Sequence, residues 1–224
     1  MDAELVRQAM GLFKTDQFFN LAGLTEAGPG GIYLTPEDHE TKIGASGKLP
    51  LMFLEARVVD EDGNDITPDA VGELIFRGET IMKEYYKKPK ETKETIRDGW
   101  LYTGDLAVID EDGYITLVDR SKDMIISGGE NVYSVEVEQV LNMHPDILEA
   151  AVIGIPDKKW GEIVAAIVVL KPGRTLGDND LEVFCRRHLA GYKIPRKITF
   201  TDQLPRNASG KLLKFKLREQ YRNA

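Results

Sequence analysis

Hydrophobic and polar positions follow one pattern up to about Asp119 and another beyond it. In the first part, short apolar runs flank acidic turns that contain a glycine, and such a glycine adopts the positive φ that a tight hairpin turn needs. Two hairpins are predicted in this way: 54–60 with 72–77, and 106–110 with 114–119. Residues 3–13 carry apolar side chains at helical spacing and predict an amphipathic helix, and residues 17–21 predict a short strand. This part is therefore expected to be mainly antiparallel β.

After Arg120 the pattern predicts alternating helices and strands. Ser134 is placed to cap a helix that ends before Pro145, because proline disfavours helical geometry in the preceding residue. The other predicted elements are helices over 180–189 and after Lys211, and strands over 124–126, 148–155, 163–170 and 198–201. Together they make one α+β unit of about 105 residues with a core of its own.

The composition is that of a folded globular protein. Of 224 residues, 42% are hydrophobic and 29% are charged, which excludes the disordered, collagen-like and disulfide-rich classes. Cys185 is the only cysteine, so it has no partner for an internal bridge. No apolar run reaches the roughly 18 residues of a membrane span, and the N-terminus lacks the basic and apolar start of a signal peptide. A cytoplasmic protein is expected.

Charge is distributed unevenly along the chain. The net charge is −8, yet residues 186–224 contain eleven Lys and Arg against Asp202 and Glu219, a balance of +9, so the first 185 residues carry −17. The acidic part disfavours nucleic acid as a partner, and the tail has neither clustered aromatic residues nor a known nucleic-acid module. The basic tail can instead attract a small polyanion over a long range. A solvated helix face with adjoining loops is the alternative.

A glycine-rich turn follows the first predicted strand. It begins Gly23-Leu-Thr25-Glu26 and contains three more glycines up to Gly31. Backbone amides in such a turn can approach a phosphate, Thr25 can donate its hydroxyl to it, and Glu26 can hold Mg²⁺. Taken alone, a plain loop at the end of a strand is the commoner origin of such a segment.

Two further segments place polar or flexible groups next to predicted strands. In Tyr102-Thr-Gly-Asp105 a carboxylate follows a Thr-Gly turn, and an ionised carboxylate can accept both hydroxyls of a ribose. An ordinary surface turn is the alternative. Near the junction of the two halves, Gly128 and Gly129 follow an apolar run and allow the backbone to approach a narrow ligand closely, although a linker turn explains them equally well.

The fourth segment is Pro205-Arg-Asn-Ala-Ser-Gly-Lys211. Its Gly-Lys pair is not a Walker motif, which needs an earlier glycine and a Ser or Thr after the lysine. A lysine that follows a short glycine turn can still deliver a positive charge to an anionic transition state. At an effective dielectric constant of about 20 and a separation of about 4 Å, that charge is worth roughly 4 kcal/mol. A solvated lysine would contribute almost none of it.

The order and spacing of these four segments resemble the adenylate-forming enzymes, specifically the acyl-CoA synthetase, or fatty-acid–CoA ligase, branch. The resemblance covers nearly all of the chain. Residues 23–26 resemble the family's aromatic-Gly-x-Thr-Glu motif, and residues 102–105 resemble its ribose-binding motif. Residues 119–133 resemble its hinge, and residues 205–211 resemble the motif that carries its catalytic lysine.

The resemblance implies nucleotide contacts for residues of the first part. Thr25 would contact the α-phosphate of ATP and Glu26 would contact Mg²⁺, while Gly23 would belong to the same nucleotide-binding turn. Asp105 would bind the ribose hydroxyls with help from Arg120. Thr25 and Glu26 would thereby act in catalysis together with the lysine of the fourth segment.

For the second part, the resemblance implies a hinge, a lysine and a thiol channel. Lys122 stands at the hinge position, and Lys211 would bridge the carboxylate of the acid and the α-phosphate during adenylation. Gly128, Gly129 and Glu130 would line the approach of the CoA pantetheine. The implied reaction converts a carboxylic acid and ATP into an acyl-adenylate and pyrophosphate, and thiol attack then yields acyl-CoA and AMP.

The resemblance also implies a fold. Residues 1–120 would be a β-rich remnant of a large N-terminal domain, part of a distorted antiparallel barrel, and residues 121–224 a complete small α+β domain that moves as a lid. Joining two anions requires Mg²⁺ and a cation to cancel their repulsion, and a cation on a mobile domain can be withdrawn afterwards.

Two departures from the family pattern limit these expectations. Ala22 stands where the family has an aromatic residue that packs on adenine, so the packing of the base is expected to differ. Nothing in residues 1–22 resembles the family's Ser/Thr/Gly-rich ATP loop, and most of the acyl pocket would precede these residues. The chain alone is therefore expected to lack turnover, and surface left uncovered by the absent part is expected to favour self-association. Neither the acyl chain length nor the oligomeric state can be predicted.

Three other hypotheses fit the same residues. The chain could be a non-catalytic module that binds CoA or a nucleotide through the basic tail and the glycines at 128–129. It could be a subunit that complements a separate N-terminal chain. It could also belong to an adenylation domain that transfers the acyl group to a carrier protein.

Overall fold

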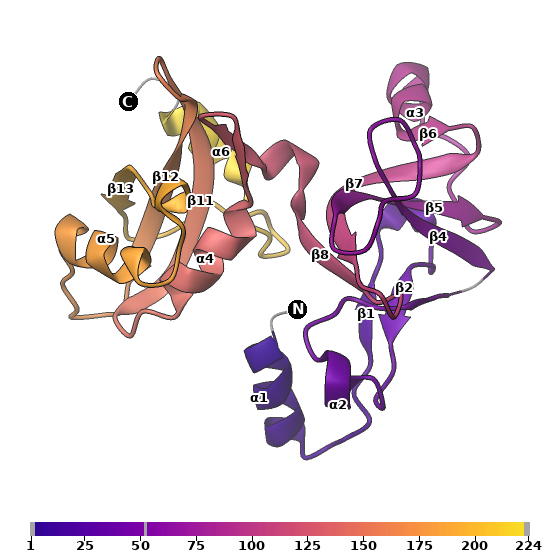
Figure 1. Ribbon diagram of the computed structural model, residues 1–224, viewed down its shortest axis with the longest axis horizontal. Helices are drawn as coiled ribbons and strands as arrows, with labels where there is room; N and C mark the ends of the chain where they lie inside the picture. Colours follow the sequence, from indigo (N-terminus) through magenta and orange to yellow (C-terminus); the bar gives the residue numbers. More distant parts are fainter. Residues whose placement is uncertain (1–2, 52, 222–224) are drawn as a thin grey trace. The chain divides into compact units, whose positions relative to one another are not determined.

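The computed structural model describes residues 3–51 and 53–221, so residues 1–2, Met52 and residues 222–224 of the basic tail lie outside the described part. The chain divides into two compact units, Met1–Ser121 (unit 1) and Lys122–Ala224 (unit 2). Each unit contains a hydrophobic core of its own. Figure 1 labels most of their helices and strands.

Unit 1 consists of short helices and two antiparallel sheets. Its elements are α1 (Ala3–Phe13), β1 (Asn20–Ala22), η1 (Thr25–Ala27), β2 (Ile32–Leu34), α2 (His39–Lys42), β3 (Leu49–Pro50), β4 (Leu54–Val59), β5 (Val71–Gly78), α3 (Pro89–Thr95), β6 (Ile96–Arg97), β7 (Trp100–Ile109) and β8 (Ile115–Arg120). One sheet has the order β1-β2-β3, and the other has the order β4-β5-β7-β6 with β8 paired to β7. Both predicted hairpins are confirmed, as β4 with β5 and β7 with β8.

The core of unit 1 joins the larger sheet to the loop that follows β1. Leu74 and Phe76 of β5 and Leu101 of β7 are buried in one cluster with Ala27 of η1 and Ile32 of β2. Because Ala27 is fully buried, it ties the short η1 turn to the sheet core. The glycine-rich segment is therefore supported by the same core as the strands that carry Asp105.

The first helix forms as predicted, but its apolar face is only partly buried. Val6 is completely buried, whereas Leu5 and Phe13 are 53% and 72% exposed. The strand predicted over 17–21 is present but shifted, since β1 begins at Asn20. Helical spacing indicates which face of a helix is apolar, and other parts of the chain decide whether that face is covered.

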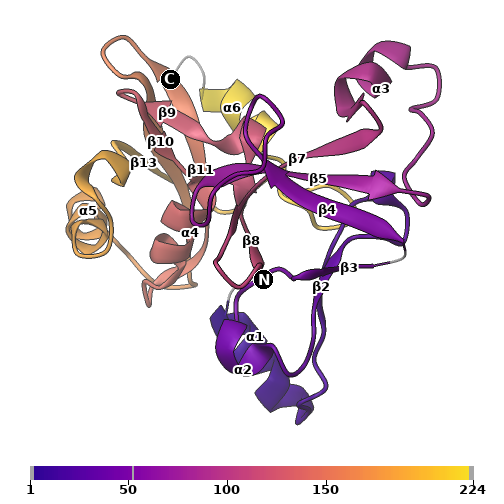
Figure 2. The ribbon, with the colours of Figure 1, turned by 45° about the vertical axis from the view of Figure 1, so that its right-hand side comes forward.

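Unit 2 is a five-stranded sheet with helices on both faces. It contains η2 (Ser121–Asp123), β9 (Ile125–Ser127), β10 (Glu130–Val132), α4 (Ser134–Asn142), β11 (Ile147–Asp157), β12 (Gly161–Leu170), α5 (Asp178–Arg186), η3 (Gly191–Lys193), β13 (Lys197–Phe200) and α6 (Lys214–Tyr221), where η2 begins at the last residue of unit 1. The strand order is β10-β9-β12-β11, and β13 pairs with β12 in parallel. Figure 2 shows this sheet from a second direction.

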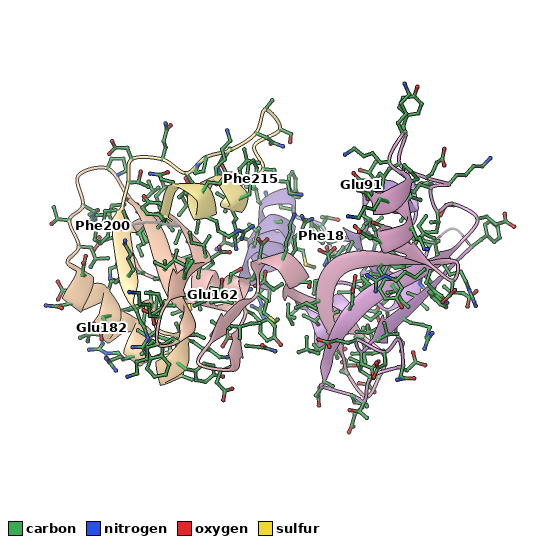
Figure 3. The ribbon with its side chains drawn as sticks, turned by 90° about the horizontal axis from the view of Figure 1, so that it is seen from above. Phe18, Glu91, Glu162, Glu182, Phe200 and Phe215 are labelled. Atoms are coloured by element: carbon green, nitrogen blue, oxygen red, sulfur yellow. The ribbon has the colours of Figure 1, made fainter. Side chains whose placement is uncertain are left out.

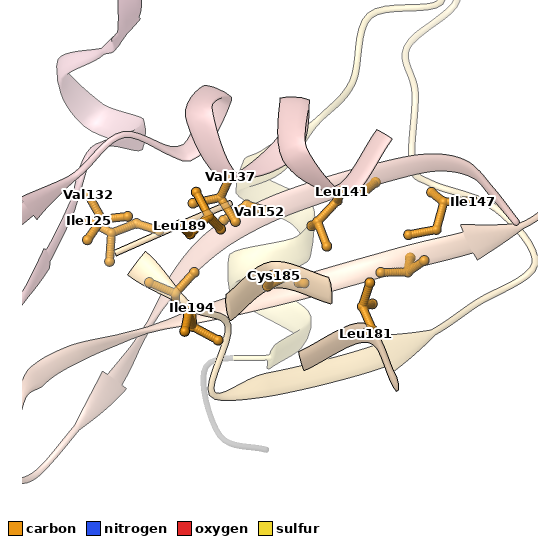
Figure 4. Close-up of a cluster of buried hydrophobic side chains, with 14 residues drawn as sticks. Ile125, Val132, Val137, Leu141, Ile147, Val152, Leu181, Cys185, Leu189 and Ile194 are labelled. Atoms are coloured by element: carbon orange, nitrogen blue, oxygen red, sulfur yellow. The ribbon is translucent and has the colours of Figure 1, made fainter. Parts of the chain in front are cut away.

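The two long strands of unit 2 are buried on both faces. Alternate residues of β11 and β12, such as Val152 and Val164, pack against Leu141 of α4 and Cys185 of α5 (Figure 4). The residues between them pack on the other face, where Leu217 of α6 covers Ile153 and its neighbours. Double burial explains why these strands read as continuous apolar runs in the sequence.

The α+β class with antiparallel sheets is confirmed, and one detail of the helix prediction is wrong. Ser134 does not cap α4 from the preceding position. It is the first helical residue, it is completely buried, and its hydroxyl accepts a hydrogen bond from Lys214 Nζ at 2.7 Å. Within residues 3–51 and 53–221, no helix is long and apolar enough to cross a bilayer.

Candidate functional site

Thr25 and Glu26 lie at the start of a single 3-10 turn that directly follows β1. The Gly28 N–H donates to the Thr25 carbonyl at 3.1 Å, and the Met82 N–H donates to the Glu26 carbonyl at 2.8 Å. These bonds hold the turn against the segment that follows β5. The Thr25 side chain is exposed and that of Glu26 is half-buried, so both are accessible to a ligand.

The glycines of this loop are required by its own backbone. A Cβ at Gly23 would lie 2.5 Å from the Gly30 carbonyl oxygen, and Gly28 has a φ of +65°. A side chain at Gly23 would force the two strands of the loop apart, and L-residues rarely adopt the φ of Gly28. The close approach predicted for these glycines is therefore found between two segments of the loop itself.

Tyr85 contacts Glu26 and was not predicted from the sequence. Its hydroxyl donates to Glu26 Oε1 at 2.7 Å. Burial, together with the hydrogen bond to Glu26, raises the pKa of the Tyr85 phenol, so the phenol remains a donor at neutral pH. One carboxylate oxygen is thus occupied by Tyr85. A hollow of about 340 Å³ lies beside Tyr85 and is lined by Lys88, Glu91, Glu94 and Thr95, and Figure 3 labels Glu91 on α3.

The donor set around Glu26 fits Mg²⁺ only as a partial site. Among the described residues, no group of three or more His, Cys, Asp or Glu side chains could hold a metal ion. Mg²⁺ in nucleotide sites is usually held by one or two carboxylates together with substrate phosphates and water. A single carboxylate such as Glu26 therefore fits a magnesium ion that arrives with a nucleotide.

Asp105 lies in a bulge of the central strand of the larger sheet. The pairing of β5 with β7 breaks between Glu73 and Ile75, and residues 103–105 of β7 have no partner in that register. Gly104 has a φ of +73°, and its N–H donates to Glu73 Oε1 at 2.7 Å. The Thr103 hydroxyl donates to the Leu74 carbonyl at 2.6 Å. Bulges re-aim side chains at functional sites, and this one fixes the backbone beside Asp105 from both directions.

Arg120 is the cross-strand neighbour of Asp105. The two residues are register partners in the β7–β8 ladder, and Arg120 Nε lies 3.3 Å from Asp105 Oδ1. The guanidinium is 43% exposed and the carboxylate 23% exposed, so the pair faces solvent. An ionised carboxylate beside a cation can accept a diol while the cation attracts a phosphate.

Four of the predicted residues of unit 2 lie near its first hairpin. Lys122 is exposed in η2, directly after the division between the units. Gly128 and Gly129 are the two turn residues between β9 and β10, with φ of +64° and +89°. Positive φ at both positions is typical of a type I′ hairpin turn, and the exposed Glu130 follows it. The two glycines therefore belong to the sheet of unit 2 and not to a linker.

Trp160 and Glu162 hold this hairpin at the sheet. The Gly128 N–H donates to the Trp160 carbonyl at 2.8 Å, and a Cβ at Gly128 would lie 2.8 Å from the indole ring. The Ile126 N–H donates to Glu162 Oε2 at 3.0 Å. The Arg196 guanidinium lies 4.5 Å from the centre of the Trp160 ring. None of these contacts could be predicted from the sequence, because they join segments more than thirty residues apart.

Lys211 follows a turn that Asn207 organises. Asn207 Oδ1 accepts hydrogen bonds from the Ser209 N–H at 3.1 Å, the Ser209 hydroxyl at 2.8 Å and the Lys211 N–H at 2.8 Å. Arg206 donates to the Gly210 carbonyl at 2.7 Å and forms an ion pair with Glu149 of β11. The turn is thus fixed to the sheet, and the Lys211 side chain is exposed.

Part of the basic tail is neutralised by ion pairs inside unit 2, so not all of its charge is open to a polyanion. Four cations of the tail are paired with acidic residues of earlier elements: Lys193 with Glu136, Arg206 with Glu149, Lys214 with Glu138, and Arg218 with Asp123. The side chain of Glu138, in the helix α4, is only 15% exposed. In the part of the chain that the structure describes, no ion pair involves Lys211. The tail therefore contributes fewer free charges toward a polyanion than its composition suggests.

The predicted site residues divide between the two units. Unit 1 carries Gly23, Thr25, Glu26, Asp105 and Arg120, and within it the structure brings Asp105 and Arg120 into contact. Unit 2 carries Lys122, Gly128, Gly129, Glu130 and Lys211, and within it Glu130 directly follows the turn that Gly128 and Gly129 form.

Comparisons with known proteins match both units. The model of the AMP-binding enzyme family matches residues 1–86, and that of the AMP-binding enzyme C-terminal domain matches residues 136–211. The chain belongs to the adenylate-forming, AMP-binding superfamily. The first match includes Gly23, Thr25 and Glu26, and the second ends at Lys211.

Individual relatives match the chain over most of its length. A feruloyl-CoA synthase from an Amycolatopsis species is 44% identical over 89% of this chain and 40% of its own length. The long-chain-fatty-acid–CoA ligase of Salmonella typhimurium is 44% identical over 89% of this chain and 35% of its own length.

A solved structure of a superfamily member shows the same fold. The o-succinylbenzoate CoA synthetase of Bacillus subtilis, in complex with its acyl-adenylate intermediate, matches 92% of this chain and 41% of its own with a TM-score of 0.82 and 40% identity. The same enzyme has been solved with ATP and a magnesium ion. The chain thus spans about two fifths of the length of the relatives that it matches.

Proposed function

We propose that this chain is the C-terminal portion of an ATP-dependent acid–CoA ligase, which forms an acyl-adenylate and then an acyl-CoA thioester. The observation that carries this proposal is the resemblance, at 44% identity through both units, to a feruloyl-CoA synthase and a long-chain-fatty-acid–CoA ligase. Its cofactors would be ATP, Mg²⁺ and CoA as a substrate, and the acid would be a fatty or other carboxylic acid. Residues 1–120 would be part of the large domain, and residues 121–224 the mobile lid.

In unit 1, the proposed task is nucleotide binding. Asp105 would accept the ribose hydroxyls, and Arg120, its cross-strand partner, would hold the carboxylate in place from 3.3 Å away. Thr25 would donate its hydroxyl to the α-phosphate, and Gly23 would let the turn close on itself. When bound, Mg²⁺ would neutralise charge on the phosphates, and Glu26 would hold it through the oxygen that Tyr85 leaves free.

In unit 2, the proposed tasks are charge neutralisation and thiol delivery. Lys211 stands on a rigid turn, outside the ion pairs that engage its neighbours in the tail, so its ammonium group is available to an anionic transition state. Gly128 and Gly129 would line the pantetheine of CoA, with Glu130 beside them. Lys122 would be the position about which the lid turns.

The nucleotide part of the proposal is tested by calorimetry with AMP. We expect Asp105→Asn to weaken AMP binding about tenfold, because the amide cannot accept two hydroxyls as an ionised carboxylate does. Asp62→Asn, at an exposed carboxylate in the same unit, serves as the matched control and should leave the affinity unchanged. An equal effect of both substitutions, or no AMP binding by the unmodified chain, would contradict the assignment.

The completeness of the site is tested by pyrophosphate release from ATP with carboxylic acids of two to sixteen carbons. We expect no turnover by this chain alone, since the relatives carry a further three fifths of their length outside the match. Robust turnover would overturn that expectation and leave the ligase assignment intact. AMP or CoA binding without turnover, even beside a separately expressed N-terminal portion of a relative, would favour the non-catalytic module instead.

A further inference from the structure

The hairpin β9–β10 is attached to the sheet of unit 2 over a very short length. β9 pairs with β12 only through Ser127 and Gly161, although β12 continues for nine more residues. Beyond that pair, β11 and β13 flank β12 and β9 turns away. The turn at Gly128 and Gly129 is therefore carried by a strand that has almost no ladder bonds to its neighbour.

Next to the Ser127–Gly161 pair, the side chain of Glu162 takes the place of a backbone acceptor. In a two-residue hairpin the residues next to the turn, here Ser127 and Glu130, form the hydrogen-bonded pair, so the Ile126 N–H faces away from β10 and toward β12. It donates to Glu162 Oε2 at 3.0 Å. Without that carboxylate the N–H would lack the ladder partner that its place in the sheet calls for.

The neighbouring strand leaves room for this carboxylate. A Cβ at Gly154 of β11 would lie 2.9 Å from Glu162 Cδ and Oε1, and 3.0 Å from Oε2. The Glu162 carboxyl group thus packs against the backbone of Gly154. A side chain at position 154 would displace it from the Ile126 N–H. Figure 3 labels Glu162 among the strands of unit 2.

We propose that Glu162 is a positioning residue that fixes the Gly128–Gly129 turn by taking the place of a ladder bond to Ile126, and that it thereby sets the affinity for the CoA thiol arm. The second half of this inference rests on the proposed role of the two glycines in CoA binding. Glu162 does not contact the ligand in this scheme. It acts through the backbone of β9, together with the hydrogen bond from the Gly128 N–H to the Trp160 carbonyl.

Residue-resolved amide hydrogen exchange tests the anchor in this chain directly. Glu162→Ala should speed exchange of the Ile126 N–H at least about tenfold, because a hydrogen bond to a charged acceptor is lost. Glu162→Gln keeps an acceptor oxygen and should stay close to the unmodified rate. Glu182→Ala, an exposed glutamate on α5, is the control for the loss of a carboxylate elsewhere in unit 2.

Exchange at Ile167, in the centre of β12, separates a local effect from unfolding. We expect its rate to be unchanged in all three variants, since it is buried in the opposite face of the sheet. Faster exchange at both Ile126 and Ile167 in Glu162→Ala would overturn the positioning role in favour of a general structural one. Unchanged exchange at Ile126 would overturn the anchor itself.

Calorimetry with CoA tests the consequence for binding. Glu162→Ala should weaken CoA binding about fivefold to tenfold, and Glu162→Gln should restore most of it. Equal CoA affinity in the alanine variant and the unmodified chain would show that the hydrogen bond from Ile126 to Glu162 does not influence CoA binding. If the unmodified chain binds no CoA, the proposed role in CoA binding fails, and the proposed effect of Glu162 on CoA affinity fails with it. The exchange rates still decide whether Glu162 holds the hairpin.

Discussion

The two units differ in how completely their large apolar side chains are covered. In unit 2, β11 and β12 are buried on one face by α4 and α5 and on the other by α6, so its core is closed by its own helices. In unit 1, large apolar side chains remain on the surface: Leu12, Phe13 and Phe53 are 78%, 72% and 87% exposed. The difference indicates that unit 2 can fold independently, whereas the surface of unit 1 is suited to contact with another polypeptide.

The tryptophans make this comparison measurable, because the chain has two and each unit contains one. Trp100 begins β7 in unit 1, and Trp160 precedes β12 in unit 2. Replacing either one by phenylalanine leaves fluorescence that reports on a single unit during unfolding in urea. The stability of each unit can then be followed separately in the predictions below.

The largest expected effect is a cavity in the closed core of unit 2. Leu141 of α4 is completely buried, and Leu141→Ala should lower the free energy of unfolding of unit 2 by about 3 kcal/mol. The Trp160 transition should shift while the Trp100 transition stays in place. Leu148→Ala, at a leucine that is 58% exposed in the same unit, is the control and should shift neither. A common shift of both transitions would mean that the units unfold as one body.

A smaller effect is expected from the ion pair that links α6 to α4. Lys214 Nζ lies 2.6 Å from Glu138 Oε1, and the two side chains are 12% and 15% exposed. Glu138 Oε1 also accepts the Val152 N–H at 2.8 Å. Lys214→Met should destabilise unit 2 by about 2 kcal/mol, because it leaves a largely desolvated carboxylate without its cation.

Two further variants test whether charge is the cause. Adding Glu138→Gln to Lys214→Met removes the stranded charge but keeps an acceptor for Val152, and should recover at least half of the loss. Lys216→Met replaces an exposed lysine on the same helix and should be nearly neutral. If Lys214→Met behaves like Lys216→Met, the pair contributes nothing to the closure of unit 2.

The exposed apolar side chains of unit 1, among them Leu12 and Phe13, predict self-association. The double variant Leu12→Glu, Phe13→Glu should raise the dissociation constant of self-association at least about tenfold, as measured by light scattering over a concentration series. Met143→Glu, at a methionine 60% exposed in unit 2, is the control and should have no effect. A monomeric unmodified chain at high concentration, or an equal effect of both changes, would show that the uncovered helix face does not drive association.

The same contrast explains how much could be predicted from the sequence. The long strands of unit 2 were predictable because double burial produces unbroken apolar runs, and the hairpins of unit 1 because acidic turns with glycine mark them. Helix α3 was not predicted, because Pro89–Thr95 contains no buried residue and therefore no apolar period. The capping position was predicted one residue too late, since Tyr133 precedes the helix and Ser134 is its first residue.

For the candidate site, local motifs were visible and their supports were not. Thr25, Glu26, Asp105 and Lys211 each stand in a recognisable short segment. Tyr85 contacts Glu26 across 59 residues and Glu162 contacts Ile126 across 36, and no spacing rule connects such pairs. Asn207 is the exception, because an asparagine two residues before a serine in a Gly-containing turn signals the hydrogen bonds that it makes.

The smallest expected effect concerns acid and the buried histidine of unit 1. His39 is 5% exposed, and in the described part of the chain neither ring nitrogen meets a hydrogen-bond partner. Burial lowers the pKa of His39 below the ordinary value of 6.5, with the Asp38 carboxylate opposing the shift. The unfolded chain therefore binds the proton more readily than the folded one, so the contribution to stability is complete above about pH 6.5 and declines as the pH falls through that value toward the folded pKa.

Unfolding in urea at pH 7.5 and at pH 5.5, followed through Trp100, measures this difference. His39→Phe removes the titrating ring and should make the loss of unit 1 stability between the two pH values smaller than in the unmodified chain. His188→Gln, at an exposed histidine in unit 2, should leave that loss unchanged. If the stability of unit 1 falls as much in His39→Phe as in the unmodified chain, groups other than His39 cause the loss at low pH. A reduced dependence would place part of the acid sensitivity of unit 1 at the buried ring of His39.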